Sequence, residues 1–177
     1  MTTNKRRVVV PALAALAILA AVAAYLFQPW KLWTDDVVDE ALPGVTDVAG
    51  RPAAEGGTSV RVLAAGRFVS HEHTTSGTVR VLVLPDGDRV LRLEDFTTSN
   101  GPALEVWLAD APVVAGREGW FVFDDGEHAE LGELKGNVGD QNYALPPTVD
   151  LSRLSSVSIW CDRFNVSFGA AELRLRS

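Results

Sequence analysis

The feature that most constrains this chain is an unbroken apolar segment of 20 residues, 8–27. As an α-helix it would be about 30 Å long, which matches the hydrocarbon thickness of a bilayer. The basic cluster Lys5-Arg6-Arg7 precedes the segment. Because basic flanks stay in the cytoplasm, the N-terminus is predicted to be cytoplasmic and the remainder extracytoplasmic. Trp30 and Trp33 follow and are expected to anchor the helix at the far interface.

A cleaved signal peptide is the alternative interpretation of this segment. Small residues suited to cleavage occur at Ala21-Val22-Ala23. The apolar run continues past them to Phe27, however, whereas the apolar core of a signal peptide usually has about 7–15 residues. We therefore predict a cytoplasmic tail at residues 1–7 and an uncleaved, single-pass anchor in the plasma membrane at residues 8–27. Both interpretations place the following domain outside the cytoplasm.

Residues 28–58 are predicted to be an extracytoplasmic linker. Thr34 is suited to cap a short helix, with Asp35 and Asp36 in its first turn. Beyond Pro43 the segment is small, polar and rich in helix breakers. A flexible linker of this length reaches roughly 25–30 Å on average, so the domain is expected to stand away from the membrane.

Residues 59–177 are predicted to form one all-β domain. Apolar and polar residues alternate with a period of two in most of this region, and no long amphipathic helix is evident. Short strands separated by frequent turns are typical of a β-sandwich or a closed barrel of antiparallel strands. The alternating apolar residues include Val79, Val81, Val83, Leu91, Leu93, Leu104, Val106, Leu108, Val157, Ile159, Phe164, Val166 and Phe168.

Three local features of the domain can be predicted. The turn sequence Pro85-Asp-Gly-Asp88 indicates a hairpin between residues 78–84 and 89–96. The apolar run 121–123 is typical of a short buried strand. The apolar phase changes from even to odd numbers at Gly169-Ala170, which predicts a β-bulge there.

Charge and cysteine content exclude several classes of function. The net charge is −7, and the only charges before residue 32 are four positive ones, so the remainder carries −11. An acidic domain repels phosphate backbones, so nucleic acid is not an expected partner. Cys161 is the only cysteine, which rules out an internal disulfide or a CxxC pair.

The histidines give weak evidence for a metal site. His71 and His73 would share one face of an extended chain, but two surface histidines at a strand end are the preferred explanation of the pattern. A blue-copper site is rejected because Met1 is the only methionine and no histidine follows Cys161. No metal site is therefore predicted.

Cys161 is the remaining candidate for chemistry. It shares its phase with Val157 and Ile159, so its side chain should point toward the core at the end of a strand. A free cysteine in that position can be an inert, small hydrophobic residue. Arg163 nevertheless follows closely, and its positive charge would favour a thiolate if the strand end opened to solvent.

Three stretches of the domain resemble the electron-transfer domain called DM-thirteen, which occurs beside DOMON domains and alone in bacterial envelope proteins. The resemblance covers roughly residues 66–175, and His73 with Ser76-Gly77 resembles the opening motif of the family. The stretches are residues 90–108, 131–143 and 156–171, including Lys135-Gly-Asn and Gly139-Asp-Gln-Asn-Tyr143 in the second and Ile159-Trp-Cys161 in the third.

This resemblance implies an electron-transfer role centred on Cys161, acting as a bare thiol or as a ligand to a prosthetic group such as haem. We prefer the bare thiol, because a haem would need a second ligand such as His73 or solvent. The supporting residues are then expected to be Trp160, Asp140, Asn142, Tyr143 and His73. The loop 135–143 is predicted to pack near the Cys161 strand end.

The sequence thus favours a membrane-anchored extracytoplasmic redox domain. Its expected partners are the membrane and another envelope redox protein or cell-surface protein. A non-redox binding or adhesion module, in which Cys161 fills the core, is the main alternative, and a structural spacer is a third. Whether the chain is an enzyme is left open.

Overall fold

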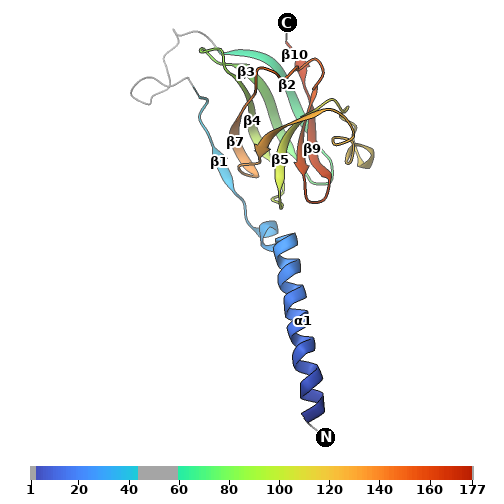
Figure 1. The fold of residues 1–177 in the computed structure, drawn as a ribbon. Helices are drawn as coiled ribbons and strands as arrows, with labels where there is room; N and C mark the ends of the chain where they lie inside the picture. The colour runs from blue at the N-terminus through green and yellow to red at the C-terminus, as the bar shows by residue number, and fades with distance from the viewer. Residues whose placement is uncertain (1–2, 44–59, 177) are drawn as a thin grey trace.

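The computed structural model describes residues 3–43 and 60–176 (Figure 1). Helix α1 spans Thr3–Phe27 and projects away from the rest of the chain. Its apolar part, Val9–Phe27, is long enough to cross a membrane and is not buried against the domain. An apolar helix at this position is consistent with a membrane anchor or with a signal sequence.

The remainder of the chain is mainly β. A short 3-10 helix, η1 (Pro29–Trp33), follows α1 directly, and a second, η2 (Arg117–Gly119), lies in the connection between two strands. The strands are β1 (Val37–Asp39), β2 (Arg61–Ser70), β3 (Ser76–Val83), β4 (Arg89–Thr97), β5 (Leu104–Ala109), β6 (His128–Glu133), β7 (Val138–Ala144), β8 (Ser156–Cys161), β9 (Val166–Glu172) and β10 (Arg174–Leu175).

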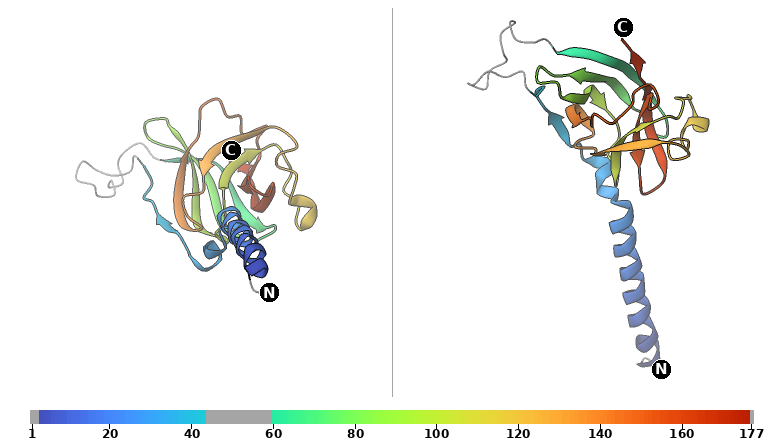
Figure 2. Two further views of the ribbon diagram at one scale, coloured as in Figure 1. Left: turned by 60° about the horizontal axis from the view of Figure 1, so that its bottom comes forward. Right: turned by 45° about the horizontal axis from the view of Figure 1, so that its top comes forward.

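The strands form one continuous, strongly curled sheet. Its order is β1-β7-β4-β3-β2-β9-β8-β5-β6, and β10 pairs with β2. Along this path β1 runs parallel to β7, and the other neighbouring strands are antiparallel. Figure 2 shows the curled sheet from two further directions. The architecture is a half-barrel of mixed strand direction, where the sequence had indicated a sandwich or closed barrel of antiparallel strands.

The long strand β2 explains why the sheet is continuous. Residues 61–67 of β2 pair with β3, whereas Phe68 and the two residues after it pair with β9. One strand therefore belongs to both halves of the sheet, which bends between them instead of dividing into two layers. Period-two patterning cannot distinguish these arrangements, because it fixes the face of each residue but not the partner of each strand.

The local predictions for the strands are partly correct. The hairpin is confirmed as β3 and β4, whose pairing runs from Val83 opposite Arg89 toward Ser76 opposite Thr97. A bulge is also present: Ile159 faces Gly169 while Trp160 faces Ser167. The additional residue is Phe168, just before the predicted position.

Two assignments were wrong. Residues 121–123 lie in the long connection between β5 and β6, where Phe123 is buried but forms no strand. Phe123 and Val122 pack on the outside of the sheet, whereas Phe121 is exposed. The stretch 135–143, predicted to be a loop, instead contains most of β7.

The segment after α1 also differs from the prediction. No helix begins at Thr34; instead β1 adds to the sheet edge, with Val37 opposite Val138 and Asp39 opposite Asp140. The first part of the predicted linker thus lies against the domain. The remaining part, residues 44–58, is outside the described residues, so the predicted domain boundaries stay predictions.

Two apolar clusters lie on opposite faces of the curled sheet. The main core includes Leu91, Phe96, Tyr143, Ile159 and Cys161. A smaller cluster lies on the other face of β5, β8 and β9 under the connection that contains η2. Its buried members are Trp107, Ala109, Ala111, Phe123, Trp160 and Ala170.

Candidate functional site

Cys161 is the last residue of β8, and its side chain is completely buried in the main core. Its thiol donates a hydrogen bond to the carbonyl oxygen of Pro102 at a distance of 3.2 Å. The neighbouring strands place Leu104 and Val166 opposite it. The thiol is therefore enclosed by the segment before β5 and by the start of β9.

The surroundings of Cys161 disfavour its thiolate. Burial raises the pKa of the Cys161 thiol, because a charged sulfur loses its hydration there. The backbone N–H groups of Phe164 and Arg163 and the charge of Arg163 act in the opposite direction, but burial is the larger effect. The strand end does not open to solvent as the sequence interpretation of Arg163 required. At neutral pH the enclosed thiol is protonated and is a poor nucleophile.

Trp160 precedes Cys161 and points to the opposite face of the sheet, since successive strand residues alternate. Its indole is almost completely buried and stacks on Trp107 with ring centroids 5.1 Å apart. Phe123 packs edge-on against it at 6.5 Å. The imidazole of His128 lies parallel to the indole of Trp107 at 4.3 Å and reaches the surface of β6. Trp160 is thus the centre of an aromatic cluster behind Cys161.

Asp140 and Asn142 bind the guanidinium group of Arg92 on the outer face of β4. The Arg92 guanidinium donates to the Asp140 carboxylate at 2.6 Å and to the Asn142 side-chain oxygen at 2.8 Å. It also forms an ion pair with Glu94. Asn142 additionally donates from its side chain to the carbonyl oxygen of Ala41, which follows β1. These contacts join β4, β7 and the segment after β1.

Tyr143 takes part in a buried hydrogen-bond network with Gln141. Its hydroxyl donates to the Gln141 side-chain oxygen at 2.7 Å and accepts from the Lys135 backbone N–H at 3.1 Å. Gln141 is fully buried and also donates to the Gly136 carbonyl oxygen. The network fixes the turn between β6 and β7. It accounts structurally for the unusual residues of the second sequence motif.

The expected grouping of these residues around Cys161 remains a prediction. Tyr143 and Cys161 belong to the same core cluster. Leu134, just before the predicted loop 135–143, donates from its backbone to the carbonyl oxygen of Leu104, which is paired with Cys161. Within the described part of the chain, however, the polar contacts of Asp140, Asn142 and Tyr143 go to other residues.

The two histidines of the opening motif have different environments. His73 is partly exposed and lies over the Phe168 ring at 3.8 Å. Burial lowers the pKa of His73, and the nearby Glu72 carboxylate opposes this shift. His71 is buried and shares a hydrogen bond with the Ser167 hydroxyl at 2.9 Å. Among residues 3–43 and 60–176, no group of three or more histidine, cysteine or acidic side chains is placed to hold a metal ion.

A family-model comparison identifies the domain. The model described as Electron transfer DM13 matches residues 67–173, which is more than half of the chain. The chain belongs to the DM13 family. The description of the family is electron transfer, and Cys161, Trp160, Asp140, Asn142, Tyr143 and His73 all lie in the matched region. No curated protein and no solved structure matches the chain.

The arrangement of this DM13 domain does not fit a haem bound at Cys161. The sulfur is hydrogen-bonded and enclosed, and neither Cys161 nor His73 lines the hollows of about 970, 350 and 290 Å³ in the described part of the chain. A haem would require the segment 102–104 to leave its place above the thiol. We therefore derive no chemistry through a haem.

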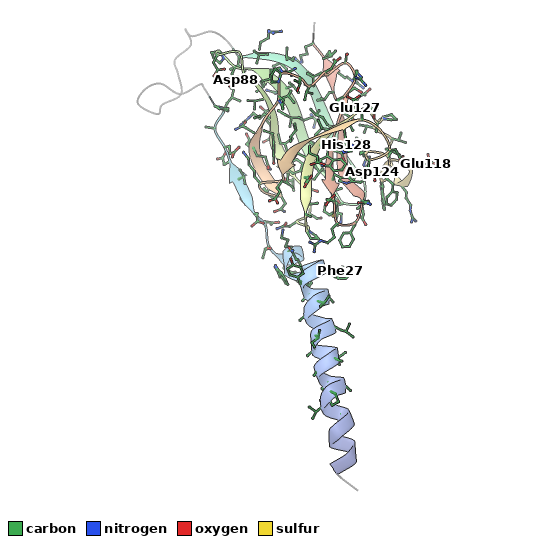
Figure 3. All side chains as sticks on the ribbon, viewed as in Figure 1. Phe27, Asp88, Glu118, Asp124, Glu127 and His128 are labelled. Atoms are coloured by element: carbon green, nitrogen blue, oxygen red, sulfur yellow. The ribbon has the colours of Figure 1, made fainter. Side chains whose placement is uncertain are left out.

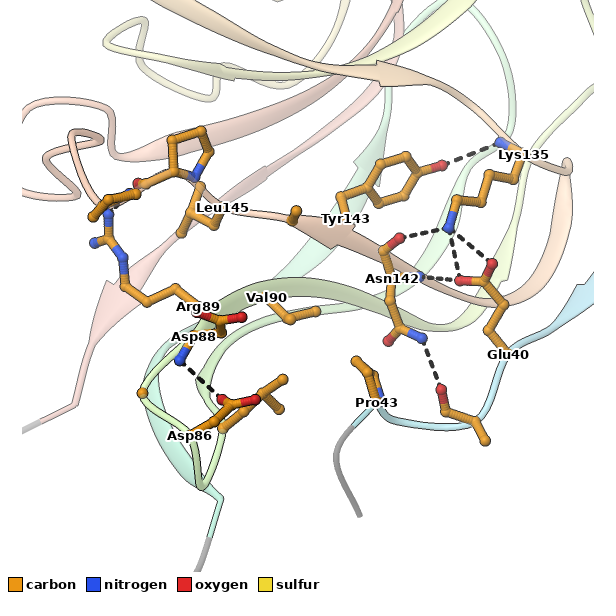
Figure 4. A pocket seen from close by; sticks show the side chains of 16 residues that line it. Glu40, Pro43, Asp86, Asp88, Arg89, Val90, Lys135, Asn142, Tyr143 and Leu145 are labelled. Carbon is orange, nitrogen blue, oxygen red and sulfur yellow. Dashed lines mark hydrogen bonds and ion pairs between the residues drawn. The ribbon is translucent and has the colours of Figure 1, made fainter. Parts of the chain in front are cut away.

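The DM13 domain carries an open cleft of about 970 Å³ that sequence reasoning missed (Figure 4). Its walls include the β3–β4 turn, β7 and residues 40–43. Lys135 forms an ion pair with Glu40 at 2.8 Å and lies over the Tyr143 ring. The cleft was not predictable because segments separated by more than a hundred residues form it.

Burial of Tyr143 leads to a prediction about alkaline stability. The pKa of Tyr143 is raised from 10.0 to about 12, chiefly by burial, so the folded state retains the phenol proton more tightly than the unfolded state. This contribution to stability is complete below pH 10 and is lost as the pH rises toward 12. The free energy of unfolding should fall by about 2 kcal/mol across this interval.

Denaturant unfolding of full-length Cys161→Ala protein in detergent micelles, with and without Tyr143→Phe, would measure this effect without interference from the thiol. Tyr143→Phe should be less stable at pH 8 but should show a shallower decline above pH 10. Equal slopes in both proteins would contradict the prediction.

Proposed function

We propose that this chain is a membrane-anchored DM13 protein that transfers electrons on the extracytoplasmic side, with Cys161 as its redox residue. The observation that carries the proposal is the match to the electron-transfer family over residues 67–173. The apolar helix α1 supports the anchor, and the single thiol within the matched region supports Cys161. The expected partner is another redox protein of the envelope.

A disulfide-exchange step is the chemistry that one thiol can perform with such a partner. After local opening around Pro102, Cys161 loses its proton to solvent, and the thiolate attacks a disulfide of the partner. A new sulfur–sulfur bond forms to Cys161, the partner disulfide breaks, and its second sulfur leaves as a thiolate. The domain then holds the partner as a mixed disulfide. One thiolate of a dithiol in a second envelope protein attacks the Cys161 sulfur, and the first partner leaves with both of its sulfurs reduced. The other thiolate of the second protein then displaces Cys161, so the second protein is oxidised to a disulfide, two electrons have passed to the first partner, and the Cys161 thiol is restored.

A non-redox binding module of the cell envelope is the second candidate. Complete burial of Cys161 favours it, since a small hydrophobic role would explain the same position. The cleft beside Tyr143 and Lys135 offers such a module a concave surface. In this alternative Cys161 contributes packing only.

The reactivity of Cys161 distinguishes the two candidates. We expect the native full-length chain in detergent micelles to react with a small aromatic disulfide at least about tenfold more slowly than the unfolded chain, because the thiol is enclosed and protonated. A redox role requires that the slow reaction occur through local opening. Its rate should then be nearly independent of denaturant at low concentrations, and the modified protein should remain folded.

The binding-module candidate gives a different denaturant dependence. If opening of Cys161 requires global unfolding, the logarithm of the rate will rise with denaturant with the slope of the equilibrium unfolding transition. Cys161→Ser provides the control for modification elsewhere. Absorbance spectra recorded before treatment would reveal any chromophore, and a band that disappears in Cys161→Ala would contradict the bare-thiol mechanism.

A further inference from the structure

The turn between β8 and β9 binds the end of the membrane helix. Arg163 in this turn donates to the carbonyl oxygen of Leu26 at 2.6 Å and to that of Tyr25 at 3.4 Å. Carbonyl groups in the last turn of a helix have no partner within the helix and carry partial negative charge. Arg163 therefore caps the C-terminus of α1, and it does so from the DM13 domain rather than from the helix itself.

Two further contacts strengthen this junction. The ring of Phe27, the last residue of α1, stacks on the ring of Phe164 with centroids 5.7 Å apart. The Lys31 ammonium group donates to the carbonyl oxygen of Gly101 at 3.1 Å, in the segment that encloses Cys161. Figure 3 shows Phe27 directly below the domain, with Asp88 at the far end. The domain thus rests on the helix by its Cys161 end.

The length of α1 sets the depth of this junction in a membrane. The span Val9–Phe27 has 19 residues and is about 28 Å long, close to the roughly 30 Å of a hydrocarbon core. Phe27 therefore reaches the outer boundary of the hydrocarbon, and Phe164, which stacks on it, lies at nearly the same depth. Phe164 is 46 % exposed, and Trp30 and Trp33 nearby are 51 % and 80 % exposed.

We propose that residues 162–165, together with Trp30 and Trp33, form a membrane-docking surface. Phe164 enters the headgroup layer beside Phe27, so the Cys161 end of the domain lies on the same bilayer that α1 spans. The occupant is lipid because the surface is continuous with a bilayer-spanning helix and carries aromatic rings, which favour membrane interfaces. This inference rests on the uncleaved anchor of the proposed function, but not on its redox chemistry.

Charge does not drive this docking. The polar cavity of about 290 Å³ at the junction is lined by Lys31 and Arg163 but also by Asp36 and Glu133, so its formal charges cancel. The domain as a whole is acidic and gains nothing from anionic lipid. Docking by aromatic contact and by the short connection to α1 should therefore be insensitive to salt.

Spin labels at opposite ends of the domain test the proposal. Asp162→Cys and Asp88→Cys, each in a Cys161→Ala background, would be labelled in the full-length chain in phosphatidylcholine vesicles. Both positions are exposed, and Asp88 serves as the control because it lies far from α1. A nickel chelate carried on a lipid headgroup should enhance relaxation severalfold more at position 162 than at position 88. A water-soluble nickel chelate should reach position 88 freely.

Further variants make the test decisive. Adding Phe164→Asn should lower the headgroup effect at position 162 toward that at position 88, and raising the salt concentration should not. Equal, weak headgroup effects at both positions would overturn the proposal, as would loss of the effect in high salt. Protection of position 162 from both nickel reagents would indicate a covering protein and would also overturn it. Release of the chain from vesicles by alkaline carbonate would instead show that the anchor itself fails.

Discussion

Replacing Trp160 with alanine should lower the free energy of unfolding by about 3–5 kcal/mol. The indole is 1 % exposed, stacks on Trp107 and packs against Phe123, so its removal leaves a cavity between β8 and the connection that contains η2. Neighbouring aromatic rings cannot collapse into this space without leaving their rotamers. Denaturant unfolding of the full-length chain in detergent micelles, followed by near-UV circular dichroism, would measure the loss.

Trp33→Ala is the matched control for this experiment. It removes the same side chain from a position that is 80 % exposed, so it should change the free energy of unfolding in micelles by less than about 0.5 kcal/mol. Cys161→Ala, on the core side of the same strand, should cost about 1–2 kcal/mol. Similar small losses for Trp160→Ala and Trp33→Ala would mean that the outer aromatic cluster does not stabilise the sheet.

Replacing Arg92 with methionine should destabilise the protein by about 3 kcal/mol. The Arg92 side chain is 11 % exposed, and its guanidinium group forms ion pairs with the carboxylates of Asp140 and Glu94. Methionine keeps much of the side-chain volume but leaves both carboxylates without their central cation. Because Asp140 also accepts the Asp95 backbone N–H, the loss should extend to the bulged part of β4.

Arg80→Met is the matched control, because it removes an exposed arginine that pairs with the same network. Arg80 also pairs with Glu94, at 3.1 Å, but its side chain is 46 % exposed. Exposed ion pairs contribute about 0–1 kcal/mol, so Arg80→Met should have a small effect. Both variants lose one positive charge, so a loss of about 3 kcal/mol in each would point to net charge and not to the Arg92 network.

These two experiments bear on how the DM13 motifs are interpreted. Asp140 and Asn142 bind Arg92, and Tyr143 is hydrogen-bonded to Gln141 and Lys135. These contacts connect strands, so they explain why polar residues occur at these positions. Trp160 is explained by packing on the outer face. Cys161 therefore stands apart as the residue whose role needs the reactivity measurement, since a buried small side chain would serve packing equally well.

Some features followed directly from the sequence because they depend on neighbouring residues. The hairpin of β3 and β4 was predictable from the Pro85-Asp-Gly-Asp88 turn and the alternation around it. The bulge near Gly169 was predictable because an extra residue reverses the phase of all later side chains. The inward orientation of Cys161 followed from the same alternation.

Strands stabilised by distant partners escaped prediction. β7 is polar and contains Gly139 with a φ of 103°, so its local sequence indicates a loop. It forms a strand because β4 and β1 pair with its two sides, and Arg92 holds its side chains. β1 has only three residues and exists through parallel pairing with a segment about a hundred residues away, which no local pattern records.

The sequence by itself determined the apolar helix, the β class of the domain, its acidic charge and its single thiol, since each depends on composition or local periodicity. Tertiary structure alone decided that the sheet is a curled half-barrel, that Cys161 is enclosed beneath Pro102, and that the domain rests on α1 through Arg163 and Phe164. The physical reason is that burial and capping depend on contacts between distant segments. Such contacts depend on which strands pair and in which register, and local sequence patterns do not specify either.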